Sequence, residues 1–71
     1  MSFYGRTEEE NYEVAKDLVI RMQKASVSMI QRHLRVGYYI AADIMHRLED
    51  EGVVGPFVGG KPREVFIKET K

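Results

Sequence analysis

The chain has 71 residues, no cysteine, and equal numbers of basic and acidic side chains, 11 of each. A chain of this length folds as one domain at most and buries only about 60% of its unfolded surface, which leaves little room for a catalytic cavity. The lack of cysteine excludes a disulfide framework and thiolate metal sites. No apolar run approaches the roughly 18 residues that span a bilayer, so we expect one cytoplasmic domain, 1–71, with a core over about 7–68 and frayed ends.

Charge is unevenly distributed along the chain even though it balances overall. The net charge is −3 over residues 1–20, +4 over 21–39, −3 over 40–52 and +2 over 53–71. The two basic blocks can form one cationic face if the fold brings them together. The total charge therefore neither indicates nor excludes a polyanionic partner.

The first predicted helix begins at Thr7-Glu8-Glu9-Glu10, which has the pattern of a capping box. The Thr7 hydroxyl can accept a hydrogen bond from the backbone N–H of Glu10, and the Glu10 carboxylate can accept one from the backbone N–H of Thr7. Apolar residues then recur at spacings of three and four, which predicts one buried stripe made of Tyr12, Ala15, Leu18, Val19 and Met22.

A second, shorter helix is predicted to begin at Ser26 or Ser28, whose hydroxyls can cap it, and to include residues 29–35. Ile30 and Leu34 lie one turn apart on its inner side. Gly37 is expected to end this helix, since glycine readily takes the left-handed conformation of a tight turn. The pattern therefore predicts two helices separated by a tight turn.

The third predicted helix begins at Tyr38 or Tyr39 and continues to Glu51, where Gly52 closes it. Its apolar residues share one side, which we expect to be buried: Ala41, Ile44, Met45 and Leu48. The opposite side, which we expect to be exposed, holds Tyr39, Ile40, Asp43, Arg47 and Asp50. A rotation of this helix that buries Tyr39 or Ile40 stays open as an alternative.

After the third helix the sequence changes to short β-prone runs broken by glycine and proline. Val53-Val54 and residues 63–67 are predicted to be two strands, and residues 59–62 are a turn signal between them. The order helix, short helix, glycine turn, helix, hairpin predicts an α+β fold: a winged helix-turn-helix with three helices and a two-stranded β-hairpin wing. In such folds the helix after the turn enters the DNA major groove, and the wing reaches the adjacent backbone.

Three segments resemble the C-terminal gamma domain of the FtsK/SpoIIIE DNA translocases. They are residues 25–38, which end in QRHLRVGY, residues 51–56, EGVVGP, and residues 60–65, GKPREV. The resemblance covers about residues 12–67. It implies a winged-helix module that reads short, G-rich polar sequences on the bacterial chromosome and so directs an attached hexameric motor during segregation. In that family the motor and its ATP site lie upstream, and this sequence has no phosphate-binding loop, so we expect no enzyme activity.

The DNA-reading positions of that family differ in this sequence. The family pattern after the glycine turn is Gly-Tyr-Asn-Arg-Ala-Ala-Arg, in which the asparagine and the arginines face DNA. Tyr39, Ile40 and Asp43 take those three places. The other positions of the pattern match: Gly37, Tyr38, Ala41 and Ala42. Arginine reads guanine and asparagine reads adenine, each worth roughly 1–3 kcal/mol of discrimination, while an aspartate can accept from cytosine N4 and an apolar group can contact a thymine methyl. The resemblance therefore implies DNA binding with altered specificity.

Double-stranded DNA is the expected partner, and two sets of residues are candidates for contacting it. Basic residues that match the family are expected at the DNA backbone, where contacts position a protein without reading sequence: Arg32, Arg35, Lys61 and Arg63. The contact face of the third helix is predicted to comprise Tyr39, Ile40, Asp43 and Arg47.

The same face also suits a different function. An exposed aromatic residue beside an exposed β-branched residue is typical of a protein contact. The alternative is therefore a winged-helix protein-interaction module that uses Tyr39, Ile40 and Asp43, with DNA binding weakened or lost. We expect no metal site, because His33 and His46 lie on different helices without converging carboxylates. No cofactor, small-molecule ligand or membrane contact is expected either.

Overall fold

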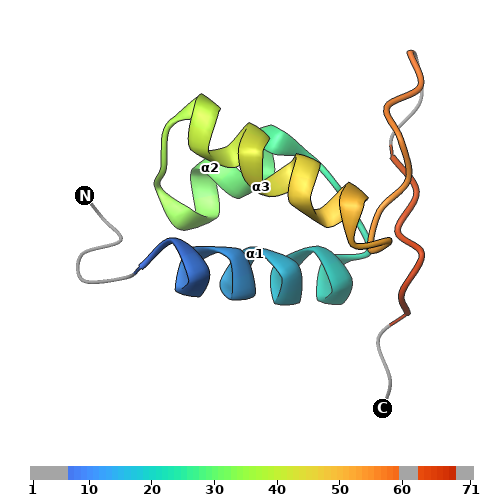
Figure 1. The fold of residues 1–71 in the computed structure, drawn as a ribbon, viewed down its shortest axis with the longest axis horizontal. Coiled ribbons are helices and arrows are strands. Elements are labelled where there is room, and N and C mark those ends of the chain that lie inside the picture. The colour runs from blue at the N-terminus through green and yellow to red at the C-terminus, as the bar shows by residue number, and fades with distance from the viewer. Residues whose placement is uncertain (1–6, 60–62, 69–71) are drawn as a thin grey trace.

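The computed structural model describes residues 7–59 and 63–68. Within these ranges the chain forms three α-helices: α1 (Glu8–Met22), α2 (Val27–Leu34) and α3 (Tyr38–Asp50). Helix α1 runs along one side of the α2–α3 pair, and the segments after α3 pass beside the C-terminal ends of α1 and α3 (Figure 1). Residues that are far apart in the sequence are thereby brought together at both ends of α3.

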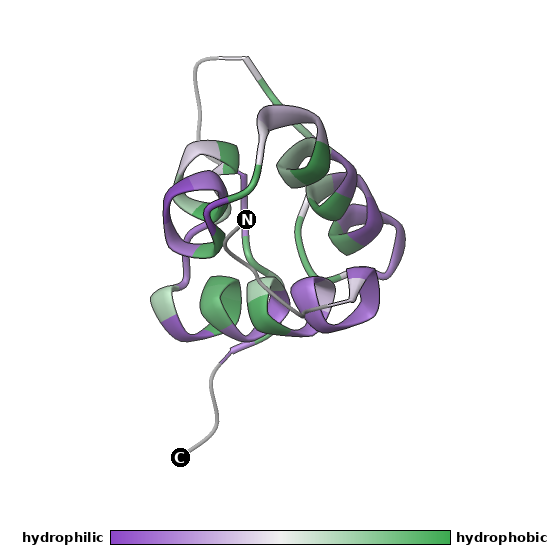
Figure 2. Cartoon of the chain, turned by 90° about the vertical axis from the view of Figure 1, so that its left-hand side faces the viewer, coloured by the Kyte–Doolittle hydropathy of each residue, from purple (hydrophilic) through white to green (hydrophobic). Residues whose placement is uncertain are grey.

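The core lies between the three helices and is closed at one end by Val53, Val54 and Val65. Hydrophobic residues concentrate where the helices face one another (Figure 2). The predicted inner residues of α2 and α3 are buried, and so are those of α1 except Met22, which is 49% exposed. Met22 is the last residue of α1, and the chain turns away through Gln23 in the left-handed conformation. The apolar spacing of the sequence therefore includes Met22, although the buried stripe of α1 ends before it.

Side-chain caps explain where the first two helices begin. The backbone N–H of Glu10 donates to Thr7 Oγ1 at 3.0 Å, and that of Thr7 donates to Glu10 Oε1 at 2.8 Å, which confirms the predicted capping box. At α2 the cap is Ser26, whose Oγ accepts from the backbone N–H of Met29 at 3.2 Å. Each such cap stabilises its helix by about 1 kcal/mol.

The turn between α2 and α3 differs from the expected one. Arg35, and not Gly37, takes the left-handed conformation, with φ of 59°, and its backbone N–H donates to Gln31 O at 2.8 Å. Gly37 is extended, with φ of −74°, and occupies the position before the first residue of α3. The expectation that a glycine makes this turn is therefore wrong. Arg35 accepts a conformation that costs a non-glycine residue roughly 1–2 kcal/mol, and the buried Val36 that follows anchors the turn in the core.

The predicted α+β class with a two-stranded β-hairpin wing is wrong, because the described residues form helices and no strand, so the fold is all-α. Two isolated antiparallel bridges, Ala25–Arg63 and Val54–Val65, are the β-type pairs found there. Residues 53–55 and 64–66 share two backbone hydrogen bonds, both 2.8 Å long. The described residues of these segments form isolated bridges and not a continuous ladder, so neither segment qualifies as a strand. Most of the predicted turn, residues 60–62, lies outside the described part of the chain.

Candidate functional site

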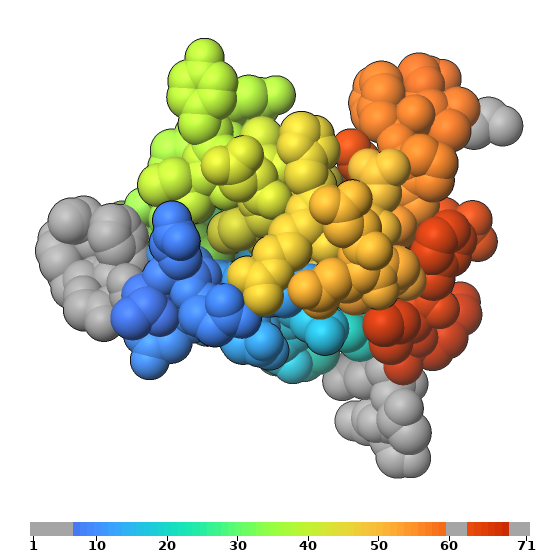
Figure 3. Space-filling view, viewed as in Figure 1, coloured from blue at the N-terminus to red at the C-terminus, as the bar shows by residue number. Residues whose placement is uncertain are grey.

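Helices α2 and α3 pack together across a short turn, which is the arrangement of a helix-turn-helix unit. The first residues of α3 project from the surface beyond this turn (Figure 3). Tyr38 is 57% exposed, Tyr39 83% and Ile40 49%, and the two tyrosine rings pack edge to face with their centroids 5.7 Å apart. Neither Tyr39 nor Ile40 is buried, so the rotated alternative for this helix does not apply.

The outer side of α3 carries Tyr39 and Asp43, both exposed, as the sequence predicts. Ile40 lies on the edge that faces α1, where it lines a cavity together with Asp43 and Arg47. On the other edge, Tyr38 and His46 border a groove of about 810 Å³ that also touches the start of α2. The polar lining of this groove includes Ser26, Ser28 and Gln31, and no pattern in the sequence indicates it.

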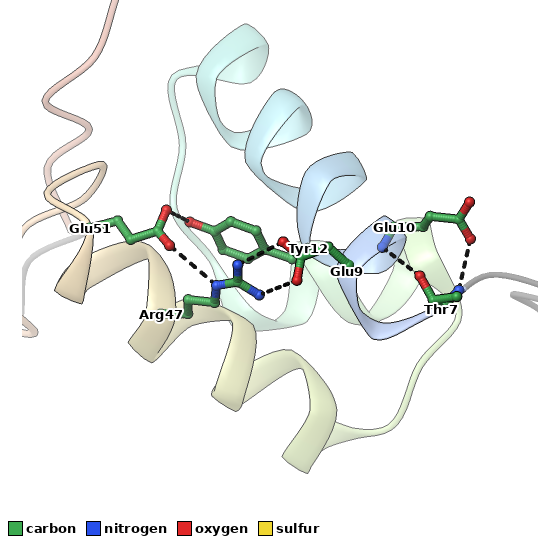
Figure 4. A network of polar contacts seen from close by, with 6 residues as sticks. All are labelled: Thr7, Glu9, Glu10, Tyr12, Arg47 and Glu51. Atoms are coloured by element: carbon green, nitrogen blue, oxygen red, sulfur yellow. Dashed lines mark hydrogen bonds and ion pairs between the residues drawn. The ribbon is translucent and has the colours of Figure 1, made fainter.

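Arg47, the fourth predicted contact residue of α3, is held by other side chains of the chain itself (Figure 4). Its Nη1 and Nη2 donate to the two carboxylate oxygens of Glu9 at 3.1 and 2.8 Å, and its Nε donates to Glu51 at 3.3 Å. Its guanidinium carbon lies 3.9 Å from the centre of the Tyr12 ring, and the Tyr12 hydroxyl donates to Glu51 at 2.6 Å. We call these four residues, Glu9, Tyr12, Arg47 and Glu51, the α1–α3 clasp.

The charges of the α1–α3 clasp stabilise one another. The hydrogen bonds from Arg47 lower the pKa of Glu9, and the hydrogen bond from the Tyr12 hydroxyl, followed by that from Arg47, lowers the pKa of Glu51. Burial and the bond to Glu51 raise the pKa of Tyr12. The clasp therefore favours ionised carboxylates around a charged arginine and a neutral tyrosine, and it joins α3 to the start of α1.

The predicted basic residues do not share one surface environment. Arg32 is exposed on α2 and forms no ion pair within the described ranges, and Arg35 is exposed at the end of that helix. Arg63 lies near the opposite end of α3, where its side chain is only 13% exposed and donates to Glu49 and to Gly55 O at 3.0 and 2.9 Å. Lys61 lies outside the described residues.

Partners of Arg47 and Arg63 were missed by the sequence analysis. Arg47 and Glu51 are four residues apart on one helix, a spacing that permits an ion pair. Glu9 is 38 residues away from Arg47 in sequence, and no local pattern links them. A buried tyrosine such as Tyr12 normally has a hydrogen-bond partner for its hydroxyl. The sequence therefore indicated that a partner exists, but not that it is Glu51.

The described residues offer neither a metal site nor a membrane span. No three histidine, cysteine, aspartate or glutamate side chains there lie close enough to hold a metal ion between them. None of the helices formed by these residues has the length and apolar character needed to cross a bilayer.

Comparison with known proteins identifies the family. Residues 6–68 match the family described as the Ftsk gamma domain. The chain is 46% identical to the DNA translocase SpoIIIE of Bacillus subtilis strain 168 over 68 residues, which is 96% of this chain and 9% of that protein. It is 53% identical to the DNA translocase FtsK of Bacillus cereus over 64 residues, 90% of this chain and 8% of that protein. The chain thus spans less than a tenth of these relatives, and it belongs to the FtsK gamma domain family.

Proposed function

We propose that the chain binds double-stranded DNA in a sequence-directed manner through α3, with a target that differs from the G-rich sequences of the family. Membership of a family whose longer relatives are named DNA translocases supports this proposal. The observation that carries it is the exposed start of α3 directly after the α2–α3 turn, where Tyr39 is 83% exposed and Ile40 49%. In helix-turn-helix proteins the N-terminal residues of the second helix contact base edges in the major groove.

The side chains at this position suit bases other than guanine. Asp43 carries only hydrogen-bond acceptors when ionised, so it can accept from cytosine N4 and cannot donate to guanine O6 or N7. Tyr39 and Ile40 offer apolar surface to a thymine methyl group. We therefore expect a target in which cytosine or thymine, on the strand that α3 reads, occupies the places that guanine takes in the family.

Contacts to the DNA backbone are assigned in this proposal to Arg32 and Arg35, which come from α2 and its end. We assign Arg47 and Arg63 to the support of α3, because each already contacts carboxylates of this chain. Lys61 stays a candidate from the sequence. Few cations on this side mean few released counterions, so we expect modest affinity and a shallow dependence on salt.

We infer that the chain itself catalyses no reaction. The translocase activity in the names of the relatives belongs, in this proposal, to parts of those proteins outside the 8–9% that this chain matches. Because the proposed partner is chromosomal DNA, we expect the domain to work in the cytoplasm.

Selection from a random duplex library at low salt, followed by anisotropy titration of the enriched duplex, tests the proposal. Arg32→Ala is expected to weaken binding about equally for all sequences and to reduce the slope of log K against log salt by about 1. Arg21→Ala is the matched control, since Arg21 is an exposed arginine of α1 paired with Asp17, and it should change neither quantity.

Tyr39→Ala separates sequence reading from backbone attraction. We expect it to reduce binding to the enriched duplex while leaving the weaker binding to random duplex unchanged. No enrichment of any duplex at low salt would contradict the proposal and leave the protein-interaction alternative for the same face.

A further inference from the structure

Ile40 and Asp43 place an apolar group and a hydrogen-bond acceptor side by side on the exposed part of α3. They are three residues apart on one helix, a spacing that makes two side chains neighbours on the helix surface. Both line the cavity between α3 and α1, beside Asn11, so they share one edge of α3. Helical side chains lean toward the N-terminus of their helix, and the side chain of Asp43 therefore leans toward the turn that carries Ile40.

Both side chains are available to a ligand. The carboxylate of Asp43 is exposed and forms no ion pair with the residues that the structure describes. Ile40 is 49% exposed, so about half of its surface stays packed against the chain. Its branched Cβ restricts the first side-chain torsion angle. Ile40 therefore presents a small apolar surface in a well-defined position next to the acceptor.

The bases differ in how well their major-groove edges fit this pair. Cytosine presents the N4 amino group, which donates to a carboxylate, but it has no methyl group. Thymine presents a methyl group at C5, but its O4 is an acceptor that repels the carboxylate of Asp43. Cytosine that is methylated at C5 presents the donor and the methyl group on neighbouring ring atoms. It therefore satisfies Asp43 and covers Ile40 at the same time.

We infer that α3 recognises 5-methylcytosine, with Asp43 accepting a hydrogen bond from N4 and Ile40 contacting the methyl group at C5. This inference rests on the proposed binding of double-stranded DNA through α3, and it specifies a base that is read there. Methylation at C5 leaves the base pair with guanine unchanged. The same DNA sequence is then bound more tightly when it is methylated.

The place of the methyl group matters as much as its presence. In N4-methylcytosine the methyl group replaces one hydrogen of the amino group, and the remaining N–H pairs with guanine. No N–H donor is then left in the major groove for Asp43. N6-methyladenine loses its major-groove donor in the same way. The carboxylate therefore selects methylation of the ring carbon over methylation of the amino group.

Fluorescence anisotropy with the duplex enriched from the random library tests this inference. Each cytosine of that duplex is replaced in turn by 5-methylcytosine, N4-methylcytosine or thymine in otherwise identical synthetic DNA. At one position we expect 5-methylcytosine to bind about fourfold more tightly than cytosine, because one more methyl group is removed from water. N4-methylcytosine and thymine at this position should both bind more weakly than cytosine, because each leaves the carboxylate without a donor.

Variants assign the two contacts to their side chains. Ile40→Ala should remove the preference for 5-methylcytosine over cytosine and keep that for cytosine over thymine. Ile40→Val, which keeps a branched side chain, should retain most of the methyl preference and guards against a loss of folding. Asp43→Ala should bind cytosine and N4-methylcytosine equally. Ile67→Ala is the matched control, since Ile67 is a 40% exposed isoleucine outside α3, and it should change none of these ratios.

The outcomes separate this inference from the proposed function. No enrichment of any duplex contradicts the proposed function, and this inference with it. An enriched motif without cytosine, or one whose affinity is unaffected by methylation at C5, overturns this inference alone. A preference for 5-methylcytosine that persists in Ile40→Ala also overturns it, because the methyl group then acts through another residue or through the shape of the DNA.

Discussion

The two ends of α3 differ in what the side chains on its polar side contact. At the α1–α3 clasp, Arg47 is bonded to Glu9 and Glu51 and lies over the ring of Tyr12. Two turns earlier, Tyr39 is 83% exposed and packs against Tyr38 alone among aromatic neighbours in the described chain. Both residues are on the polar side of the helix in the sequence. The position of a residue on the polar side of a helix therefore does not show whether its side chain holds the helix in place or is exposed to a partner.

Replacement of the two tyrosines should show this difference most strongly. Tyr12→Ala removes a side chain that is 2% exposed, and we expect it to lower the free energy of unfolding by about 3–5 kcal/mol, which is enough to unfold a domain of this size. Tyr39→Ala should change it by less than about 0.5 kcal/mol. Urea denaturation followed by circular dichroism measures both. Similar losses of unfolding free energy in the two variants would show that Tyr39 packs against the core.

Asn11→Leu should stabilise the domain beside the clasp. A buried acceptor without a partner costs about 1–3 kcal/mol, and leucine has a similar volume and a higher helix propensity, so we expect a gain of about 1 kcal/mol. Asn11→Asp is the contrasting variant, which should destabilise the domain because it places a charge in the same buried position. A loss of stability in Asn11→Leu would mean that the oxygen of Asn11 already has a partner.

Acid should weaken the clasp. The pKa values of Glu9 and Glu51 lie below the ordinary 4.5 in the folded chain, so their ion pairs contribute stability above about pH 4.5 and lose it as pH falls through the lowered values. Arg47→Gln should therefore reduce the melting temperature near pH 7. The difference in melting temperature between this variant and the wild type should shrink toward pH 3. Thermal melts of both proteins between pH 7 and pH 3 measure this change.

Arg21→Gln is the control for the acid series. It removes an exposed arginine whose partner, Asp17, is four residues earlier on the same helix, and such pairs contribute little. We expect a smaller effect near pH 7 than for Arg47→Gln. A difference between Arg47→Gln and wild type that stays constant down to pH 3 would contradict the role assigned to the two glutamates.

Local patterns predicted much of the fold. The capping box at Thr7 and the buried stripes of α2 and α3 depend on residues within one or two turns, and both are confirmed. The predicted wing was wrong, because strand pairing depends on contacts between separate segments, and the described residues there form isolated bridges and no strand. Likewise, Arg35 and not Gly37 takes the left-handed conformation after α2. The preceding helix and the buried Val36 hold Arg35 in this conformation, and they outweigh the preference of glycine for it.

The candidate site was predictable in part for the same reason. The exposure of Tyr39 and Ile40 follows from helical periodicity and is confirmed. The partners of Arg47 and Arg63 are 38 and 14 residues away in sequence, so only the packed helices reveal that these two cations are engaged. The cavity beside Asn11 arises where two helices meet, and a single sequence carries no signal for it.

In the proposed function, the exposed start of α3 does not read guanine. Affinities of the wild type and of the Ile40→Arg/Asp43→Arg double variant for a G-rich duplex and for a duplex of the same composition in shuffled order test this claim most directly. We expect the wild type to bind both duplexes equally and the double variant to prefer the G-rich duplex by at least about tenfold, since each arginine–guanine pair is worth roughly 1–3 kcal/mol. A wild type that already prefers the G-rich duplex, or a double variant that gains equally for both, would contradict the account.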